Sequence, residues 1–532
     1  MLSIQGLSYA YPNEELLFRD VNLTLQDRNK ISLIGNNGSG KSTFLRIVMG
    51  LTKPLDGTIF SDTPPFYVPQ HFGQFEELPV ADAMQVGEKL QALREILDGN
   101  VSANNYLLVD DDWTIQERCN QALQHWGLTG MDLGRKMGSL SGGEKTRVFL
   151  SAITIHQPRI VLLDEPSNHL DGNGRELLYA FIRSTKSSLI VVSHDRELLN
   201  LLNTTCELGK EGIVVYGGNY DFYAAQKEIE KHALALTLRA SEKALRKARE
   251  TERKVMEQQQ RSDSRGKGKQ DKAGVARIMM NTLRNKAENS TSKTKDVHSE
   301  KIAQLSQQLQ ALRSNMVKTG SIKLEFMQTG LHGGKVLFDA TGINYRYDGQ
   351  NWIWKNPLDI HITTGERVAI SGQNGSGKTT LVKIIVGELN PQQGNFYRAK
   401  SDAICIDQDY SLIDNQRTVY QQAQQFNNGD LSEHEVKARL NRFLFGQAHW
   451  DQYCSHLSGG EKMRLTLCCL TVRNRPPDIV ILDEPTNNLD IQNIEVLSHA
   501  VQAYEGTIII ISHDVKFVEK AGVKKIIELD GA

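Results

Sequence analysis

One glycine-rich stretch occurs twice in this sequence, and its two copies decide the fold. They read Gly35-Asn36-Asn37-Gly38-Ser39-Gly40-Lys41-Ser42 and Gly372-Gln373-Asn374-Gly375-Ser376-Gly377-Lys378-Thr379. Each copy follows a short apolar run, Ile31–Ile34 or Val368–Ile370, and leads into a helical pattern. In the pattern GxxxxGK[ST], glycines let backbone N–H groups turn toward phosphates, and the helix N-terminus favours negative charge. We therefore predict two phosphate-binding loops, each between a buried strand and a helix.

Three further motifs also recur, in the same order in each half. They are Leu-Ser-Gly-Gly-Glu-Lys at 140–145 and 457–462, an apolar run closing in Asp-Glu-Pro at 160–166 and 479–485, and Ser-His-Asp at 193–195 and 512–514. Four motifs in one order, twice, exclude a chance glycine turn. The chain is an internal duplication, and strands followed by helices in each half predict an α/β fold with two tandem nucleotide-binding domains.

The spacing between the two copies predicts the domain boundaries. Gln70 and Gln408 lie 338 residues apart, whereas Ser141 and Ser458 lie 317 apart, so the first half has about 20 extra residues between these points. We expect domains at 1–218 and 336–532, a linker at 219–335, and an arm-like insertion at about 87–113 that includes Asp110-Asp111-Asp112.

The linker has the composition of long helices. Asn219–Arg265 and Val275–Thr319 contain no Gly or Pro and are rich in strong helix formers. Between them, the basic run Arg265-Gly266-Lys267-Gly268-Lys269 predicts a flexible break, and hence a long α-helical hairpin with a basic tip. Residues 224–334 carry 23 Lys and Arg against 12 Asp and Glu, a net charge of +11, while the rest of the chain has −12. This segregation indicates a polyanionic partner.

Paired residues near the loops have distinct expected roles. Lys41 and Lys378 would neutralise the β- and γ-phosphates. The expected Mg²⁺ ligands are Ser42, Gln70, Asp164, Thr379, Gln408 and Asp483. The expected general bases for an attacking water are Glu165 and Glu484, with His194 and His513 contacting the γ-phosphate. Tyr11 and Tyr347 would stack on adenine, although core packing is a nearly equal alternative, and a strand-end Asp-Glu taken alone could be a helix cap.

Together these motifs resemble the ATP-binding cassette superfamily over almost the whole chain. In that family two cassettes pair head to tail, so the resemblance implies ATP and Mg²⁺ as ligands and two composite sites within one monomeric chain. Each phosphate loop, with Thr43 or Thr380 beside it, would face the Leu-Ser-Gly-Gly-Glu-Lys signature of the other half. The signature residues implied are Ser141, Gly142 and Gly143 for the second loop, and Ser458, Gly459 and Gly460 for the first.

More narrowly, the chain is similar to the F subfamily, whose members act on ribosomes. The tandem cassettes, Gly217-Gly218-Asn219-Tyr220 and the long basic linker carry this resemblance. It implies contact with ribosomal RNA and transfer RNA near the exit site and the peptidyl-transferase centre, for relief of stalled ribosomes or protection from antibiotics. The tip residues implied are Arg261, Arg265, Lys267, Lys269, Arg277, Met279 and Met280. A solvated basic face, with the methionines in coiled-coil packing, is the alternative.

Other features limit the compartment and the competing functions. The six cysteines form no CxxC pair, which favours a reducing compartment. No basic and apolar leader is visible, and no apolar run approaches the ~18 residues of a membrane span, so we expect a cytoplasmic protein without a membrane segment. The rival function is the ATPase subunit of a membrane importer, which the long basic linker disfavours. A DNA-repair ATPase would be expected to carry zinc-binding cysteine pairs.

Overall fold

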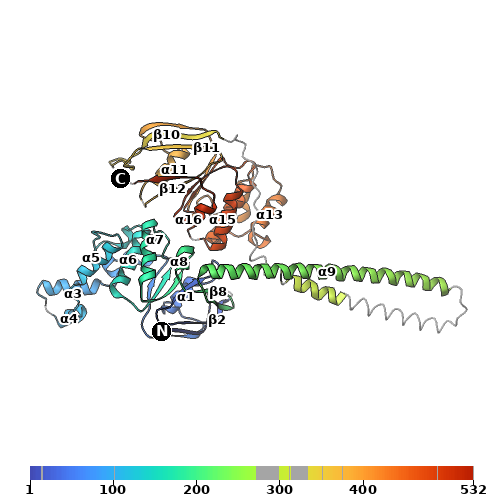
Figure 1. The fold of residues 1–532 in the computed structure, drawn as a ribbon, viewed down its shortest axis with the longest axis horizontal. Coiled ribbons are helices and arrows are strands. Elements are labelled where there is room, and N and C mark those ends of the chain that lie inside the picture. Colours follow the sequence, from blue (N-terminus) through green and yellow to red (C-terminus); the bar gives the residue numbers. More distant parts are fainter. Residues whose placement is uncertain are drawn as a thin grey trace. The chain divides into compact units, whose positions relative to one another are not determined.

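The computed structural model describes residues 1–12, 16–100, 102–270, 299–310, 312, 334–349, 351–373, 375–487 and 489–530. Asn374, Arg277, Met279 and Met280 therefore lie outside the described residues. The chain divides into two compact units, Met1–Asp221 with Ile322–Ala532, and Phe222–Ser321. The first unit holds both cassettes, and the predicted α/β class is confirmed (Figure 1).

A six-stranded sheet forms the centre of the first cassette, in the order β5-β6-β7-β3-β8-β9. Its strands are β3 (Lys30–Ile34), β5 (Phe66–Val68), β6 (Ile160–Asp164), β7 (Ser188–Val192), β8 (Thr204–Gly209) and β9 (Gly212–Tyr216). All neighbours are parallel except β8 and β9. Every residue of β6 and β7 is buried, as expected of apolar parallel strands covered on both faces. The carboxyl ends of β3, β6 and β7 thus meet at one edge, where the repeated motifs begin.

The remaining elements of the first cassette surround this sheet. An antiparallel sheet has the order β2-β1-β4, formed by β1 (Leu2–Ala10), β2 (Leu16–Leu25) and β4 (Asp56–Ser61). The helices are α1 (Lys41–Val48), α2 (Val80–Ala83), α3 (Gly87–Leu97), α4 (Ala103–Val109), α5 (Ile115–His125), α6 (Gly142–His156), α7 (Gly172–Ser184) and α8 (Arg196–Asn200). The expected insertion at 87–113 contains α3 and α4.

The second cassette repeats this frame. Its parallel sheet has the order β14-β15-β16-β12-β17, and its antiparallel sheet the order β11-β10-β13. The strands are β10 (Val336–Asn344), β11 (Leu358–Thr363), β12 (Arg367–Gly372), β13 (Gln393–Arg398), β14 (Ala403–Ile406), β15 (Ile479–Asp483), β16 (Thr507–Ile511) and β17 (Lys525–Leu529). The helices are α11 (Lys378–Val386), α12 (Val419–Gln425), α13 (Glu433–Arg442), α14 (Gly459–Val472), α15 (Ile491–Ala503) and α16 (Val515–Lys520).

The linker begins with one helix, α9 (Tyr220–Gln270), of 51 residues (Figure 1). The predicted break at Arg265–Lys269 is wrong, because α9 continues through these residues. Two glycines cost about 1 kcal/mol each in a helix, and extending an existing helix among Lys, Arg and Gln residues needs no new nucleation. Residues 299–310 are also helical. No helix in the described part of the chain is long and apolar enough to cross a membrane.

Candidate functional site

The two phosphate loops have the same backbone shape. Gly38 and Gly375 have φ of +80° and +83°, and no atom lies within 4 Å of where a Cβ would stand. Gly40 and Gly377 have φ of +90° and +86°, but a Cβ on Gly40 would lie 2.5 Å from Leu17 Cδ2. Glycine is therefore required at these positions, because only glycine adopts this conformation readily. Each loop is packed on one side and open on the other, where a phosphate can approach the backbone.

A lysine begins the helix after each loop and bonds back to it. Lys41 Nζ donates to the carbonyl oxygen of Gly35 at 2.8 Å, and Lys378 Nζ donates to that of Gly372 at 2.8 Å. Burial lowers the pKa of both ammonium groups. Each positive charge therefore stands at the rim of its loop, at the place expected for neutralising phosphate oxygens.

Several buried polar atoms in these sites have no hydrogen-bond partner among the residues that the structure describes. They are Ser39 Oγ, Ser376 Oγ, Asp164 Oδ1, Glu165 Oε1 and His513 Nε2. A buried polar atom without a partner costs roughly 1–3 kcal/mol, so such atoms need an explanation. The serine oxygens of the phosphate loops and the carboxylate oxygen at the end of β6 are suited to bind a nucleotide and Mg²⁺, because this cation prefers carboxylate, hydroxyl and phosphate oxygens.

Asp164 and Asp483 end the equivalent strands β6 and β15. Asp164 is only 1% exposed, and its Oδ2 accepts a hydrogen bond from the Tyr67 hydroxyl at 3.1 Å. Burial raises its pKa, while Ser42 and Tyr67 act in the opposite direction. Asp483 is half-buried, and burial raises its pKa as well. The structure thus brings Ser42 and Asp164 together, as the sequence predicted for a shared cation.

The residue after each strand is a glutamate with left-handed backbone, which is buried in the first cassette and half-buried in the second. Glu165 has φ of +50° and Glu484 has φ of +47°. His194 Nε2 lies 3.3 Å from Glu165 Oε1, and His513 Nε2 lies 3.4 Å from Glu484 Oε1. Burial raises the pKa of Glu165 to about 8 and that of Glu484 to about 7. A carboxyl group that titrates near neutral pH suits a general base.

Burial has the opposite effect on the two histidines. It lowers the pKa of His194 well below its usual value, and that of His513 to about 4. Both rings are therefore neutral at pH 7 and can donate one N–H to an anionic oxygen. In each cassette the histidine ring therefore lies beside the glutamate that follows the strand.

The two tyrosines expected at the adenine are held in the same way. The Tyr11 hydroxyl lies 2.8 Å from Thr43 Oγ1, and the Tyr347 hydroxyl lies 3.2 Å from Thr380 Oγ1. Each ring lies edge-on to a second tyrosine two residues earlier, with centroids 5.3 and 5.2 Å apart. Both tyrosines are 41% exposed, so core packing does not explain them. A ring face beside the first turn of the helix remains open to a planar base.

The signature serines lie at helix N-termini in their own cassettes. Ser141 caps α6 in a capping box with Glu144, and Ser458 caps α14 in the same way with Glu461. A residue of the second cassette that contacts the first loop is Asp490. The backbone N–H of Asn37 donates to Asp490 Oδ2 at 3.1 Å. Asp490 is not among the residues predicted from the sequence; its signal there is the Leu-Asp pair that follows each Asp-Glu-Pro.

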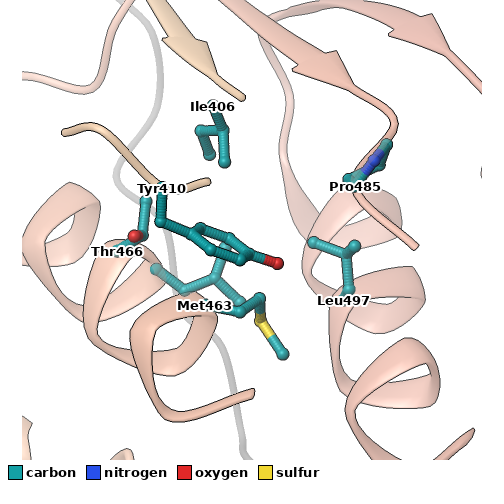
Figure 2. Close-up of a pocket in the computed structure, with 7 residues that line it drawn as sticks. Ile406, Tyr410, Met463, Thr466, Pro485 and Leu497 are labelled. Carbon is teal, nitrogen blue, oxygen red and sulfur yellow. The ribbon is translucent and has the colours of Figure 1, made fainter. Parts of the chain in front are cut away.

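Gln70 and Gln408 follow the edge strands β5 and β14 and are half-buried. Between the end of β14 and the helices α14 and α15 lies a small gap that has no room for a water molecule. It is lined by Ile406, Tyr410, Met463, Thr466, Leu467, Pro485 and Leu497. Figure 2 shows the Tyr410 ring pointing into this gap toward Leu497. The lining is largely apolar and offers no cation, so the gap is a packing feature rather than a phosphate site.

The first cassette fills the equivalent space. Phe149 occupies the position of Thr466 in the signature helix, and its ring stacks on Phe72 with centroids 5.4 Å apart. Phe72 corresponds to Tyr410 of the second cassette, by their positions two residues after Gln70 and Gln408. The two halves therefore share a frame but differ in the side chains that pack on the signature helix at this point, Phe72 on Phe149 in one and Tyr410 beside Thr466 in the other.

Comparison with known proteins agrees with this duplicated architecture. The family described as ABC transporter matches residues 18–168 and again 355–487. ABC transporter F family member 5 of Arabidopsis thaliana is 28% identical, with 99% of this chain and 75% of the relative covered. The probable ATP-binding protein YbiT of Escherichia coli O157:H7 is 29% identical, with 96% and 92% covered.

Solved structures show the same fold at greater distance. An archaeal ribosome recycling factor, aABCE1, was solved in complex with the ribosomal stalk protein aP1. It has a TM-score of 0.61 and 19% identity, with 99% of this chain and 88% of that chain covered. At this identity the likeness establishes the arrangement of strands and helices, and the roles of individual residues depend on the geometry above.

Proposed function

Because this chain belongs to the ATP-binding cassette family, we propose that ATP binding and hydrolysis drive its association with the ribosome and its release. The chain is an ATPase, and proteins of the F family are among its relatives. In the proposed cycle, ATP closes the two cassettes on each other, the closed form binds the ribosome, and hydrolysis releases it. The linker would then act near the exit site and the peptidyl-transferase centre.

The paired residues supply the proposed ATP chemistry. A magnesium ion held by the Ser42 hydroxyl and Asp164 would neutralise charge on the phosphates. Lys41 would exchange its bonds to loop carbonyls for phosphate oxygens, and the loop N–H groups would hold the same oxygens. Glu165 would accept a proton from the attacking water, while His194 donates to the γ-phosphate. The corresponding groups of the second cassette would act in the same way.

One observation in the linker carries the ribosome proposal. Lys243, Arg246, Lys247 and Arg249 lie within two turns of α9, and all four are exposed. No acidic residue falls between 243 and 249. Exposed cations concentrated on one helix provide the electrostatic attraction that a nucleic-acid backbone requires. The structural likeness to aABCE1, a ribosome recycling factor, and the relatives in the F family support the same class of partner.

Sedimentation with purified ribosomes tests the proposal. The chain carrying Glu165→Gln and Glu484→Gln should co-sediment with ribosomes only when ATP is present, because ATP remains bound without hydrolysis. Neutralising the four helix cations to Gln should weaken binding and reduce its dependence on salt, since each lost phosphate contact lowers the salt slope by about one.

A matched control removes four exposed lysines of the cassettes instead. They are Lys53, Lys186, Lys355 and Lys524. This variant should keep the binding and the salt slope of its parent. Equal losses in the two variants would show only an effect of net charge. No ATP-dependent association of the parent at low or high salt would refute the ribosome proposal.

A further inference from the structure

The two cassettes place different side chains beside their strand-end aspartates. In the first, the Tyr67 hydroxyl donates to Asp164 Oδ2 at 3.1 Å. Because Oδ2 is occupied, the free Oδ1 is the oxygen left for a cation.

The sheet register identifies the equivalent residue in the second cassette. Tyr67 of β5 pairs with Leu162 of β6, and Cys405 of β14 pairs with Ile481 of β15. Leu162 and Ile481 both stand two residues before the strand-end aspartate. Cys405 therefore occupies the place of Tyr67, as its position three residues before Gln408 also indicates.

Cys405 does not reproduce the tyrosine contact. Its thiol is a weak donor on a short side chain, and the described residues show no hydrogen bond from it to Asp483. Asp483 is also less buried than Asp164. The Asp164 carboxylate is thus held by a neighbouring hydroxyl, whereas Asp483 has no such contact from Cys405 among the described residues.

We propose that Tyr67 is a positioning residue that orients Asp164 for the cation of the first ATP site, and that the second site lacks this support. The inference rests on the proposed role of the two aspartates as Mg²⁺ ligands. The groups that hold a metal ligand in place commonly contribute 10- to 100-fold to metal affinity. The first site should therefore bind the divalent cation of a nucleotide complex more tightly than the second.

The test measures Mn²⁺ binding by electron paramagnetic resonance with ATP present, in the Glu165→Gln, Glu484→Gln chain. Asp483→Asn leaves only the first site able to bind the cation, and Asp164→Asn leaves only the second. In the first-site chain, Tyr67→Phe should weaken Mn²⁺ binding about tenfold, because it removes the hydroxyl and keeps the ring. In the second-site chain, Cys405→Ser should change the affinity less than twofold.

The matched control is Tyr179→Phe, which removes a similar hydrogen bond in the same cassette. The Tyr179 hydroxyl donates to Asp195 Oδ2 at 2.6 Å, and this carboxylate is not proposed to bind the cation. The control should keep Mn²⁺ affinity within twofold. Unchanged affinity in Tyr67→Phe, or an equal loss in Cys405→Ser, would overturn the inference while leaving the ATPase intact. A parent with no Mn²⁺–ATP binding would instead refute the proposed sites themselves.

Discussion

Replacing the two glutamates that follow β6 and β15 by glutamine should separate hydrolysis from ATP binding. In Glu165→Gln with Glu484→Gln, the amide has nearly the same shape as the carboxyl group but cannot accept a proton. General-base catalysis is worth roughly 10²- to 10⁴-fold, or about 3–5 kcal/mol of barrier, so steady-state phosphate release should fall by that factor. ATP affinity should change little, because the loops and lysines are untouched.

The same substitution should stabilise the nucleotide-free protein in a pH-dependent way. The pKa of Glu165 is raised by burial from 4.5 to about 8. Below the pKa of the unfolded chain, such a carboxyl group does not lower the free energy of unfolding. As pH rises through the pKa of the folded protein, the free energy of unfolding falls, because the unfolded chain gives up its proton more easily. One pKa unit corresponds to about 1.4 kcal/mol, so the cost at pH 9 is on the order of a few kcal/mol.

Glutamine has no such titration, so the variant should melt higher than its parent at pH 9 and similarly at pH 4.5. Thermal unfolding at the two pH values, with phosphate release measured in parallel, checks both effects. Glu117→Gln, an exposed glutamate of α5, is the matched control and should show neither. Wild-type turnover in the double variant would remove these glutamates from the base role. An equal gain in melting temperature at both pH values would refute the burial argument.

Three further substitutions test the packing around the sites. Gly40→Ala should lower both the melting temperature and the ATP affinity, because its Cβ would stand 2.5 Å from Leu17. Gly38→Ala should cost only about 1 kcal/mol of backbone strain. Equal effects of the two substitutions would contradict the one-sided packing of the loop. Phe149→Thr should cost roughly 3 kcal/mol of unfolding free energy in denaturant titration, since it removes the stacked ring; a loss below about 1 kcal/mol would contradict the importance of this packing.

The repeated motifs made the fold and most of the ATP-site residues predictable. A phosphate loop needs a strand before it and a helix after it, so Gly35–Ser42 predicted β3 and α1 together. The apolar run Ile31–Ile34 indeed lies in a strand, since β3 spans Lys30–Ile34, and a short apolar run of this kind suits a buried parallel strand. At these positions the local sequence pattern and the packing in the fold favour the same structure.

Features that depend on pairing between distant segments could not be predicted in the same way. The Tyr67 contact arises from the register of β5 on β6, which joins residues 97 positions apart. The left-handed backbone of Glu165 likewise follows from the bend after the strand, and no local preference of glutamate indicates it. The break predicted at the two linker glycines is wrong for a different reason, because the helix formers around Gly266 and Gly268 outweigh the cost of two glycines in α9.

Because α9 is one unbroken helix, its length determines how far its end moves when the helix rotates. A helix of 51 residues is about 77 Å long at 1.5 Å per residue. Turning such a rod by about 10° at its first residue moves its last residue by roughly 13 Å, a distance greater than the width of a helix. Adjustments of an ångström or two among the residues that hold Tyr220 would thus become displacements of nucleotide size at Gln270.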